Sequence, residues 1–316
     1  MNDHWGDEPL ATRARRLLGR RHPVAAVATV TRSGVVTAGW GAEPESDFEI
    51  GSISKGVTGL LYRDAVERGV VRGDTTLGEL LPLTGGCAGI TLSAISQHRS
   101  GLPGVPASPG RSLRLRLRGE NPCGGTVDEL IEQASGVEPG PPRPRSSTFA
   151  FELLGHALAR ASRMTYPELV HERIASRLGL KSWYLPADPS QLRPGALTGC
   201  SRRGRARPPW TGEALGPAGG IRSTVSDLGD LARALLDGRA PGMSALDPVA
   251  RLSGSAVMIG AAWITLEHRG RAVTGHHGGT GGFRSWIGLD RESGTGAVVL
   301  SATARPVDGA GFCLLP

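Results

Sequence analysis

Ser52 and Lys55 are three residues apart, and their residue types could supply a nucleophile and its base. They lie in the segment Phe48-Glu-Ile-Gly-Ser-Ile-Ser-Lys55, which opens a helical pattern, so both side chains share one helix face. A serine hydroxyl needs a base to take its proton. A lysine can be that base where burial or nearby positive charge lowers its pKa. The spacing therefore predicts covalent catalysis by Ser52 with Lys55 as general base.

The use of lysine at position 55 strengthens this interpretation. The chain has 36 basic residues, of which only Lys55 and Lys181 are lysines. Arginine stays protonated in proteins and could not act as a base. The N-terminus of the helix would also offer backbone N–H groups near Ser52 for a developing oxyanion. In the alternative reading, Ser52 only caps the helix and Lys55 lies on the surface, because Ser-x-x-Lys alone occurs by chance in many chains.

The elements that must position this pair form a mixed pattern. The runs 24–30 and 35–40 flank a turn and predict a β-hairpin. Four short strands are expected near the C-terminus, at 261–267, 272–276, 283–289 and 296–301. Helical patterns cover 9–20, 52–68, 77–81, 92–98, 127–135, 149–162, 166–178 and 224–237. The pattern predicts an α/β (α+β) fold, in which helices flank one antiparallel sheet built from both chain ends.

We expect one catalytic domain over residues 1–316. Its α/β part would comprise about 1–60 and 215–316, and a mostly helical lobe of about 61–214 would be inserted between them. The Gly/Pro/Arg-rich loops at 99–125 and 185–216 are expected to shape the pocket. The end of the chain, 302–316, is short and holds two glycines and two prolines. We therefore expect one face of the sheet to be poorly covered, or covered by a partner subunit.

Composition excludes several classes of protein. With 316 residues and 39% hydrophobic content, the chain can bury a large core. No apolar stretch is long enough to span a bilayer, and the acidic N-terminus has no leader-like apolar run, so we expect a cytoplasmic protein without membrane contact. Cys87, Cys123, Cys200 and Cys313 are far apart and have no histidine at metal spacing. They are expected to be free thiols, with no metal site and no cofactor.

The net charge of +7 raises the question of an anionic partner. Arginines cluster at 111–118 and 202–207 and could grip phosphates. Aromatic residues make up only 4% of the chain and do not alternate with these clusters, which argues against nucleic-acid binding. An acidic or phosphate-bearing small substrate remains open.

The segment 48–55 closely resembles the nucleophile segment of class C β-lactamases and their relatives among penicillin-binding proteins and esterases. Four further segments resemble the same superfamily in the same order, at 90–103, 153–156, 217–228 and 275–283. The resemblance runs from about residue 22 to 302. It implies a β-lactamase/transpeptidase-like fold and an acyl-enzyme on Ser52.

The second motif departs from the family pattern. Relatives usually have Tyr-x-Asn about seven residues before the Leu-Leu-Gly that begins here at Leu153, and this register holds Ser146-Ser-Thr148. The phenolic proton relay is therefore missing. By analogy with branches that use Ser-x-Asn, Ser146 is expected to relay a proton to the leaving group and Thr148 to hydrogen-bond Lys55. The alternative is that Ser146 and Thr148 only cap the following helix.

The third motif reads His276-His277-Gly278, where many relatives have Lys-Thr-Gly. Esterase-like relatives often carry histidine at the first position, and His276 could hold a proton or a substrate carboxylate near neutral pH. Because neighbouring strand residues face opposite ways, a metal held by both histidines is not expected. By register, the N–H of Gly279 is the second oxyanion donor beside that of Ser52.

The other residues around this motif, His277, Gly278 and Thr280, are expected to contact substrate. Two further histidines, His98 and His156, and the acids Glu49 and Glu152 are expected to be structural.

These features predict an intracellular serine acyl-transfer enzyme. It would act on a small-molecule acyl donor of ester type, as an esterase or as an ester-to-amide transacylase with an amine or alcohol acceptor. By resemblance, a role in natural-product (antibiotic) biosynthesis is plausible. The alternatives are a β-lactamase or D-amino peptidase, and a catalytically inactive binding relative. The retained Ser52–Lys55 pair argues against the inactive relative, because desolvating a lysine without use is costly.

Overall fold

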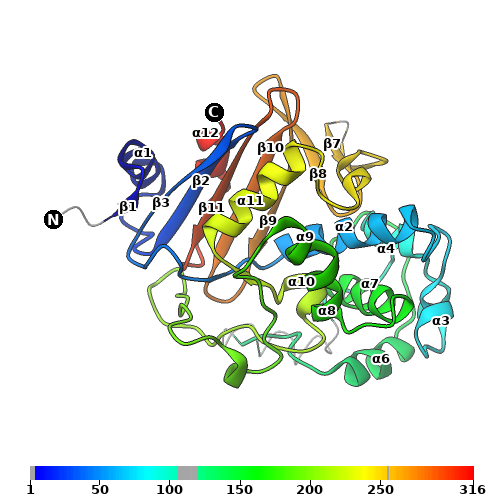
Figure 1. The fold of residues 1–316 in the computed structure, drawn as a ribbon. Coiled ribbons are helices and arrows are strands. Elements are labelled where there is room, and N and C mark those ends of the chain that lie inside the picture. The colour runs from blue at the N-terminus through cyan, green and yellow to red at the C-terminus, as the bar shows by residue number, and fades with distance from the viewer. Residues whose placement is uncertain (1–3, 106–114, 116–119, 255) are drawn as a thin grey trace.

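A nine-stranded antiparallel sheet crosses the computed structural model, which describes residues 4–105, 115, 120–254 and 256–316 (Figure 1). Its spatial order is β1-β3-β2-β11-β10-β9-β8-β7-β6, so strands from the two chain ends meet where β2 pairs with β11. The strands are β1 (Trp5–Gly6), β2 (Ala25–Thr31), β3 (Gly34–Trp40), β6 (Ala250–Ser253), β7 (Val257–Ile259), β8 (Ile264–His268), β9 (Arg271–Gly279), β10 (Arg284–Asp290) and β11 (Thr295–Ser301). The predicted fold class is confirmed.

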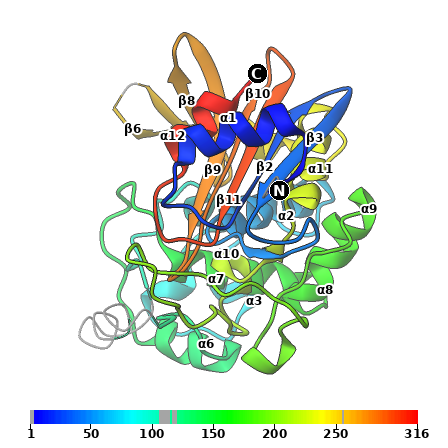
Figure 2. The ribbon, with the colours of Figure 1, turned by 90° about the vertical axis from the view of Figure 1, so that its left-hand side faces the viewer.

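Side chains alternate between the two faces of the sheet, as the period of two requires. In β2, Ala26, Ala28 and Val30 belong to the larger core cluster, while Ala25 and Val27 belong to a second cluster on the opposite face. The helices α1 (Glu8–Leu18) and α12 (Asp308–Leu314) cover this second cluster (Figure 2). The central strands of the sheet are therefore buried on both faces.

The larger cluster extends into the helical region of the chain. Helix α11 (Val225–Leu236) packs against β2, β3 and β11, and α2 (Ile53–Glu67) packs against β9 and β10. The other helical segments are α3 (Leu77–Leu80), η1 (Gly86–Gly89), α4 (Leu92–Ser96), α6 (Val127–Ser135), α7 (Thr148–Ala161), α8 (Tyr166–Val170), η2 (His171–Ala175), α9 (Ser176–Leu178), η3 (Pro189–Gln191), α10 (Gly216–Gly219) and η4 (Met243–Leu246).

Helix α2, which carries the candidate base, is buried on almost every side. Two glycines allow this close packing. A Cβ on Gly59 would lie 2.0 Å from the carbonyl oxygen of Ala261, and the indole of Trp263 lies over Gly56 and donates to its carbonyl at 3.0 Å. The helix is thus held closely against the segment 261–263 on one side.

The C-terminus differs from the expectation. The short helix α12 ends the chain and packs with α1 on β10 and β11, so this chain itself covers the sheet face expected to lack cover. Its ring contact is made by Phe312, whose ring centre lies 5.0 Å from that of Trp286, and Ala310 and Leu314 belong to the same buried cluster. Part of the predicted loop at 99–125, with most of the cluster 111–118, lies outside the described residues.

Besides the two-residue β1, two strands of this sheet were not expected from the sequence, β6 and β7. They pair with each other across a register shift and extend the sheet beyond β8. Within the described ranges, no helix combines the length and apolar character needed to cross a membrane.

Candidate active site

Ser52 and Lys55 are joined by a direct hydrogen bond at the start of α2. Lys55 Nζ lies 2.8 Å from Ser52 Oγ and 3.1 Å from the carbonyl oxygen of Ala218 in α10. Lys55 is buried, whereas Ser52 is partly exposed. A substrate can therefore reach the Ser52 hydroxyl, and the buried amine of Lys55 lies within hydrogen-bond distance of it.

Burial lowers the pKa of Lys55 from 10.5 to about 8, although the nearby Cys123 and Glu152 act in the opposite direction when they are ionised. At neutral to slightly alkaline pH a useful fraction of Lys55 is then the free amine, which can accept the Ser52 proton. This is the property that the choice of lysine over arginine at position 55 predicted.

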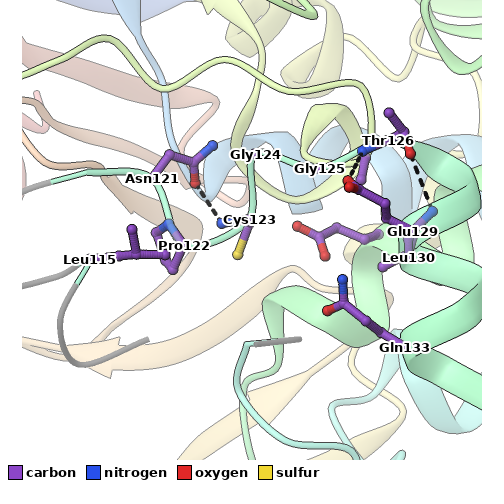
Figure 3. A pocket seen from close by; sticks show the side chains of 12 residues that line it. Leu115, Asn121, Pro122, Cys123, Gly124, Gly125, Thr126, Glu129, Leu130 and Gln133 are labelled. Carbon is purple, nitrogen blue, oxygen red and sulfur yellow. Dashed lines mark hydrogen bonds between the residues drawn. The ribbon is translucent and has the colours of Figure 1, made fainter. Parts of the chain in front are cut away.

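Glu152 and Cys123 are neighbours of Lys55 that the sequence did not identify. Glu152 is completely buried in α7, and neither carboxyl oxygen has a hydrogen-bond partner of ordinary geometry in the described part of the chain. Burial raises the pKa of Glu152 well above its ordinary value. The thiol of Cys123 and the charge of Lys55 both lower this pKa, but burial has the larger effect. The sulfur of Cys123 is directed into a pocket of about 290 Å³, which Glu152 also lines (Figure 3).

Glu152→Gln is expected to move the pH at which acylation is half-maximal from about 8 to a value about one pH unit lower. An ionised carboxylate at this position raises the pKa of Lys55, and the amide cannot do so. The measurement is the pH dependence of the acylation rate. Glu129→Gln is the matched control, because Glu129 lines the same pocket but caps α6 by accepting from the N–H of Thr126. An unchanged midpoint would mean that Glu152 keeps its proton throughout.

The predicted oxyanion donors come together through two glycines. In the β9–β10 ladder, Thr280 N–H donates to the carbonyl of Phe283 at 3.2 Å, so Gly279 occupies a pair without ladder hydrogen bonds and its N–H points away from β10. A Cβ built on Gly51 would lie only 2.5 Å from this nitrogen. The N–H of Gly279 therefore lies beside the residue that precedes Ser52, as an oxyanion hole requires.

Gly51→Ala is expected to reduce the acylation rate by about 10²-fold or more, because the new methyl group must push the Gly279 N–H away. Gly51 also has φ +52°, which is strained for alanine. Gly69→Ala is the matched control, since Gly69 has φ +70° with open space around its Cβ position. Burst kinetics with an activated ester measure the effect. Equal rates in the two variants would exclude the steric explanation.

His276 lies in buried surroundings that disfavour its charged form, and the role of holding a proton or a substrate carboxylate stays a prediction. Burial lowers its pKa well below 6.5, and the charges of Lys55, His277 and His98 lower it further. Its Nδ1 lies 2.7 Å from the carbonyl oxygen of His277 and so carries the proton. Its buried Nε2 has no hydrogen-bond partner in the described structure. His276 therefore offers a lone pair, because a charged imidazole is too costly at this depth.

The other third-motif residues lie in different environments. His277 is exposed on the opposite face of β9, with Nδ1 3.3 Å from a carboxylate oxygen of Asp308 in α12. Gly278 packs against the segment before Ser52, since a Cβ there would lie 2.0 Å from the carbonyl oxygen of Ile50. Thr280 is buried and accepts from the N–H of Phe283 at 3.2 Å. Substrate contact by these three residues stays a prediction.

The second-motif residues are not bonded to the catalytic pair. Ser146 is exposed and Thr148 is partly buried, and neither side chain forms a hydrogen bond to Ser52 or Lys55, all of which are described. The helix cap is the residue between them, because Ser147 accepts from the N–H of Ala150 at 3.0 Å. The roles assigned to Ser146 and Thr148 therefore stay predictions.

A buried ion-pair cluster holds the nucleophile segment in place. The short strand β4 (Phe48–Glu49) lies just before Ser52 in the chain and pairs with β5 (Arg222–Ser223) in a small two-stranded sheet. Arg222 Nε lies 2.8 Å from Asp47 Oδ2, and its NH1 lies 3.2 Å from Glu49 Oε1. Glu49 also accepts from the N–H of Trp210 at 2.9 Å. The expectation that Glu49 is structural agrees with these contacts.

The two histidines expected to be structural, His98 and His156, also contact neighbouring groups. The ring of His98 lies 5.1 Å from that of Phe151, and burial together with the charge of Lys55 lowers its pKa to about 4. His156 Nε2 lies 3.2 Å from the carbonyl oxygen of Ala214. Within the described residues, no group of three or more His, Cys, Asp or Glu side chains is placed to hold a metal ion.

The fold is that of the β-lactamase-like serine hydrolase superfamily. The family model described as Beta-lactamase matches residues 10–311, and the chain belongs to this family. A human relative described as beta-lactamase-like 1 is 28% identical over 228 residues. That match covers 69% of this chain, and it spans only 44% of the length of the human protein.

Solved structures share the fold. A D-alanine carboxypeptidase AmpC from Burkholderia cenocepacia superposes with a TM-score of 0.80 at 18% identity, covering 97% of this chain and 98% of that one. An octameric penicillin-binding protein homologue from Pyrococcus abyssi gives 0.81 at 21% identity, covering 97% and 76%. A class C beta lactamase from Rhodobacter sphaeroides gives 0.78 at 19%, covering 97% and 98%.

Proposed function

We propose that the protein is a serine acyl-transfer enzyme that takes an acyl group from an ester-type donor and passes it to water or to an amine or alcohol acceptor. The observation that carries this proposal is the 2.8 Å contact between Ser52 Oγ and the buried Lys55 Nζ, whose pKa is about 8. A nucleophile bonded to a base of this pKa is suited to acylation near neutral pH.

In the proposed first half-reaction, the free amine of Lys55 takes the Ser52 proton while Oγ attacks the donor carbonyl. The N–H groups of Ser52 and Gly279 stabilise the oxyanion. When the tetrahedral intermediate collapses, the bond to the leaving alcohol breaks and Lys55 returns its proton to that oxygen. No second-motif hydroxyl is hydrogen-bonded to the pair, which favours Lys55 itself as the proton donor.

In the second half-reaction, the acceptor gives its proton to Lys55 and attacks the acyl carbon. Ser52 leaves and recovers the proton from Lys55. An amine acceptor gives an amide, and water gives the free acid. In this proposal the buried Nε2 of His276, which has no hydrogen-bond partner among the described residues, accepts a hydrogen bond from the substrate or from the ammonium of Lys55. The cytoplasmic location and the role in antibiotic biosynthesis stay predictions from the sequence.

Intact-protein mass spectrometry tests the acyl-enzyme directly. The wild type, mixed with 4-nitrophenyl acetate, should gain the mass of one acetyl group, and Ser52→Ala should not. Adding water alone or a panel of amines to the labelled enzyme then shows which acceptor removes the acyl group. Equal labelling of the two proteins would place the reaction at another residue, and no labelling by any ester would favour an inactive binding protein.

Hydrolysis of β-lactams or D-amino peptides is the second candidate function. It is supported by the family to which the chain belongs and by the printed activities of two structural neighbours. A chromogenic cephalosporin and a D-alanyl-D-alanine peptide, tested beside the ester, decide between the donors. Turnover of either in preference to every ester would replace the primary proposal.

A further inference from the structure

A hollow of about 470 Å³ lies at the end of the sheet where β9 turns into β10, and arginines dominate its lining. The residues around it are Ser201, Arg202, Arg203, Arg205, Arg207, Thr280, Gly281, Arg284 and Ala304. None of these described residues is acidic. Five arginines line this one hollow and give it a positive potential, which attracts multiply charged anions.

The backbone that carries these arginines is tied to the sheet. Cys200 N–H donates to the carbonyl of Ala302 at 2.9 Å, and Ala304 N–H donates back to the carbonyl of Cys200 at 2.8 Å. The turn that follows is closed by Ser201 N–H, which donates to the carbonyl of Arg205 at 2.7 Å. Because this loop is fixed before a ligand arrives, less conformational entropy is lost on binding.

Arg284 links the hollow to the third motif. Its guanidinium donates to the carbonyls of Thr280 at 2.9 Å and Phe283 at 2.7 Å. It also lies directly over Gly279, where a Cβ would come within 2.7 Å of it. Burial lowers the pKa of Arg284, and the like charge of Arg202 lowers it further, against Asp308, which raises it. Like charges are thus held together, and an anion between them would relieve their repulsion.

The hollow is close to the proposed reaction centre. Its lining residues Thr280 and Gly281 directly follow Gly279, the proposed oxyanion donor. Two residues of extended chain span at most about 7 Å. A small substrate with its carbonyl at Ser52 can therefore place a second group in the hollow.

We propose that this hollow is a phosphate-binding subsite and that the acyl donor carries a phosphate or diphosphate group. The assignment of the ligand as acyl donor rests on the proposed acyl-transfer function. The assignment of a phosphate group to the ligand rests on the hollow alone. Phosphate oxygens match the bidentate arms of several guanidinium groups at once. One carboxylate can pair with a single guanidinium group in its bidentate geometry, whereas a phosphate or diphosphate can engage several. Among the described residues that line the hollow, none is an aromatic residue on which a nucleic-acid base could stack.

Calorimetric titration with inorganic pyrophosphate tests the subsite without catalysis. Arg203 and Arg205 are exposed, so the double variant R203Q/R205Q should keep the fold. It should bind pyrophosphate at least about tenfold more weakly than the wild type. The matched control R16Q/R20Q loses the same charge on exposed positions at and beyond α1, and it should bind as the wild type does. Equal affinity in all three proteins would overturn the subsite. A short oligonucleotide that outcompetes pyrophosphate would overturn a small-molecule ligand.

Kinetics with matched esters test the role of the subsite. One substrate is an aryl acetate with a phosphate group on the aromatic ring of its leaving phenol. A second ester carries the phosphate at the end of its acyl chain, and each substrate has an uncharged counterpart. We expect kcat/KM to rise at least about tenfold for one phosphorylated ester, and this gain to be lost in R203Q/R205Q. No gain for either ester would overturn the donor assignment. If no ester acylates Ser52 while S52A still binds pyrophosphate, the proposed function fails and the anion site stands.

Discussion

Replacing Lys55 by arginine is expected to lower the rate of Ser52 acylation by about 10²- to 10⁴-fold, the usual contribution of a positioned general base. Arginine keeps a positive charge of similar reach, but it cannot give up its proton at any pH that the protein survives. The guanidinium would also have to fit a buried space in which one ammonium contacts Ser52 and Ala218. Burst kinetics with an activated ester measure the loss.

The wild type should show a pH dependence that Lys55→Arg lacks. The base is the neutral amine, so the acylation rate should fall about tenfold per pH unit below the pKa of Lys55 and level off above about 8. A profile that instead falls as pH rises through 8 would mean that the ammonium is the active form. In that case Lys55 would act as an electrostatic or hydrogen-bonding group and not as the base.

Lys55→Met separates lost chemistry from lost folding. The pKa of Lys55 falls from 10.5 in the free side chain to about 8 in the folded protein, so the folded state binds this proton less tightly than the unfolded state. The cost to stability is absent above pH 10.5, grows as pH falls, and is complete below about 8, where it amounts to about 3 kcal/mol. Methionine removes this cost and loses two hydrogen bonds, each worth about 1 kcal/mol. Lys55→Met should therefore be inactive yet at least as stable as the wild type at pH 7.

The nucleophile pair and the central sheet could be predicted because local signals determine them. The period-two runs of β2 and β3 and the glycine turns between the C-terminal strands specify their pairing. The i, i+3 spacing places Ser52 and Lys55 on one helix face whatever surrounds them. The pattern of β6 and β7 is weaker. Ala250–Ser253 and Val257–Ile259 are short and pair with a bulge, so hydrophobic alternation does not mark them.

The surroundings of Lys55 could not be read from sequence spacing. Cys123 lies 68 positions from Lys55 along the chain, and Glu152 lies 97 positions away, so only the packing of a loop and of α7 brings them to the amine. One available signal was Glu152 itself, the acidic residue of a largely apolar helix. The protonation state of His276 was also beyond the sequence, because it depends on complete burial beside Lys55.

In the second motif, counting residues along the chain does not determine which side chain contacts the start of the helix. Counting back from Leu153 places Ser146 and Thr148 in the family positions, but the loop turns so that Ser147 faces the helix end. Ser147 Oγ donates to the carbonyl of Pro103 at 2.5 Å and accepts from the N–H of Ala150. Which of three consecutive hydroxyl residues caps a helix depends on the loop that packs on it.

Replacing Arg222 by methionine is expected to destabilise the protein by about 3–5 kcal/mol at pH 7. Arg222 is 1% exposed, and its guanidinium contacts Asp47, Glu49 and the carbonyl of Leu197. It also lies 5.5 Å from the ring centre of Phe283. The variant leaves two buried carboxylates without their cation, and this loss is far more costly than a broken surface pair. The free energy of unfolding from denaturant titration measures it.

The pKa values of Asp47 and Glu49 determine how the effect of Arg222→Met on stability changes with pH. Burial raises the pKa of Asp47, but the hydrogen bonds and charge of Arg222 outweigh it, so that pKa lies below the ordinary 3.8. The Asp47–Arg222 interaction thus stabilises the fold above pH 3.8, and this stabilisation is lost as pH falls through the lowered pKa. For Glu49, burial dominates and its pKa is raised despite Arg222. The difference between wild type and Arg222→Met should therefore be largest near neutral pH and shrink in acid.

A neutral triple variant, D47N/E49Q/R222M, distinguishes lost charge balance from lost packing. If uncompensated carboxylates cause the instability, the triple variant should be more stable than Arg222→Met alone at pH 7, although it carries two further substitutions. Because Glu49 lies three residues before Ser52, the acylation rate should recover together with stability. A triple variant that is no more stable than Arg222→Met would show that the guanidinium acts by filling space against Phe283. Arg222→Lys would then restore little, because an ammonium replaces neither the planar stacking surface nor the forked pair of contacts.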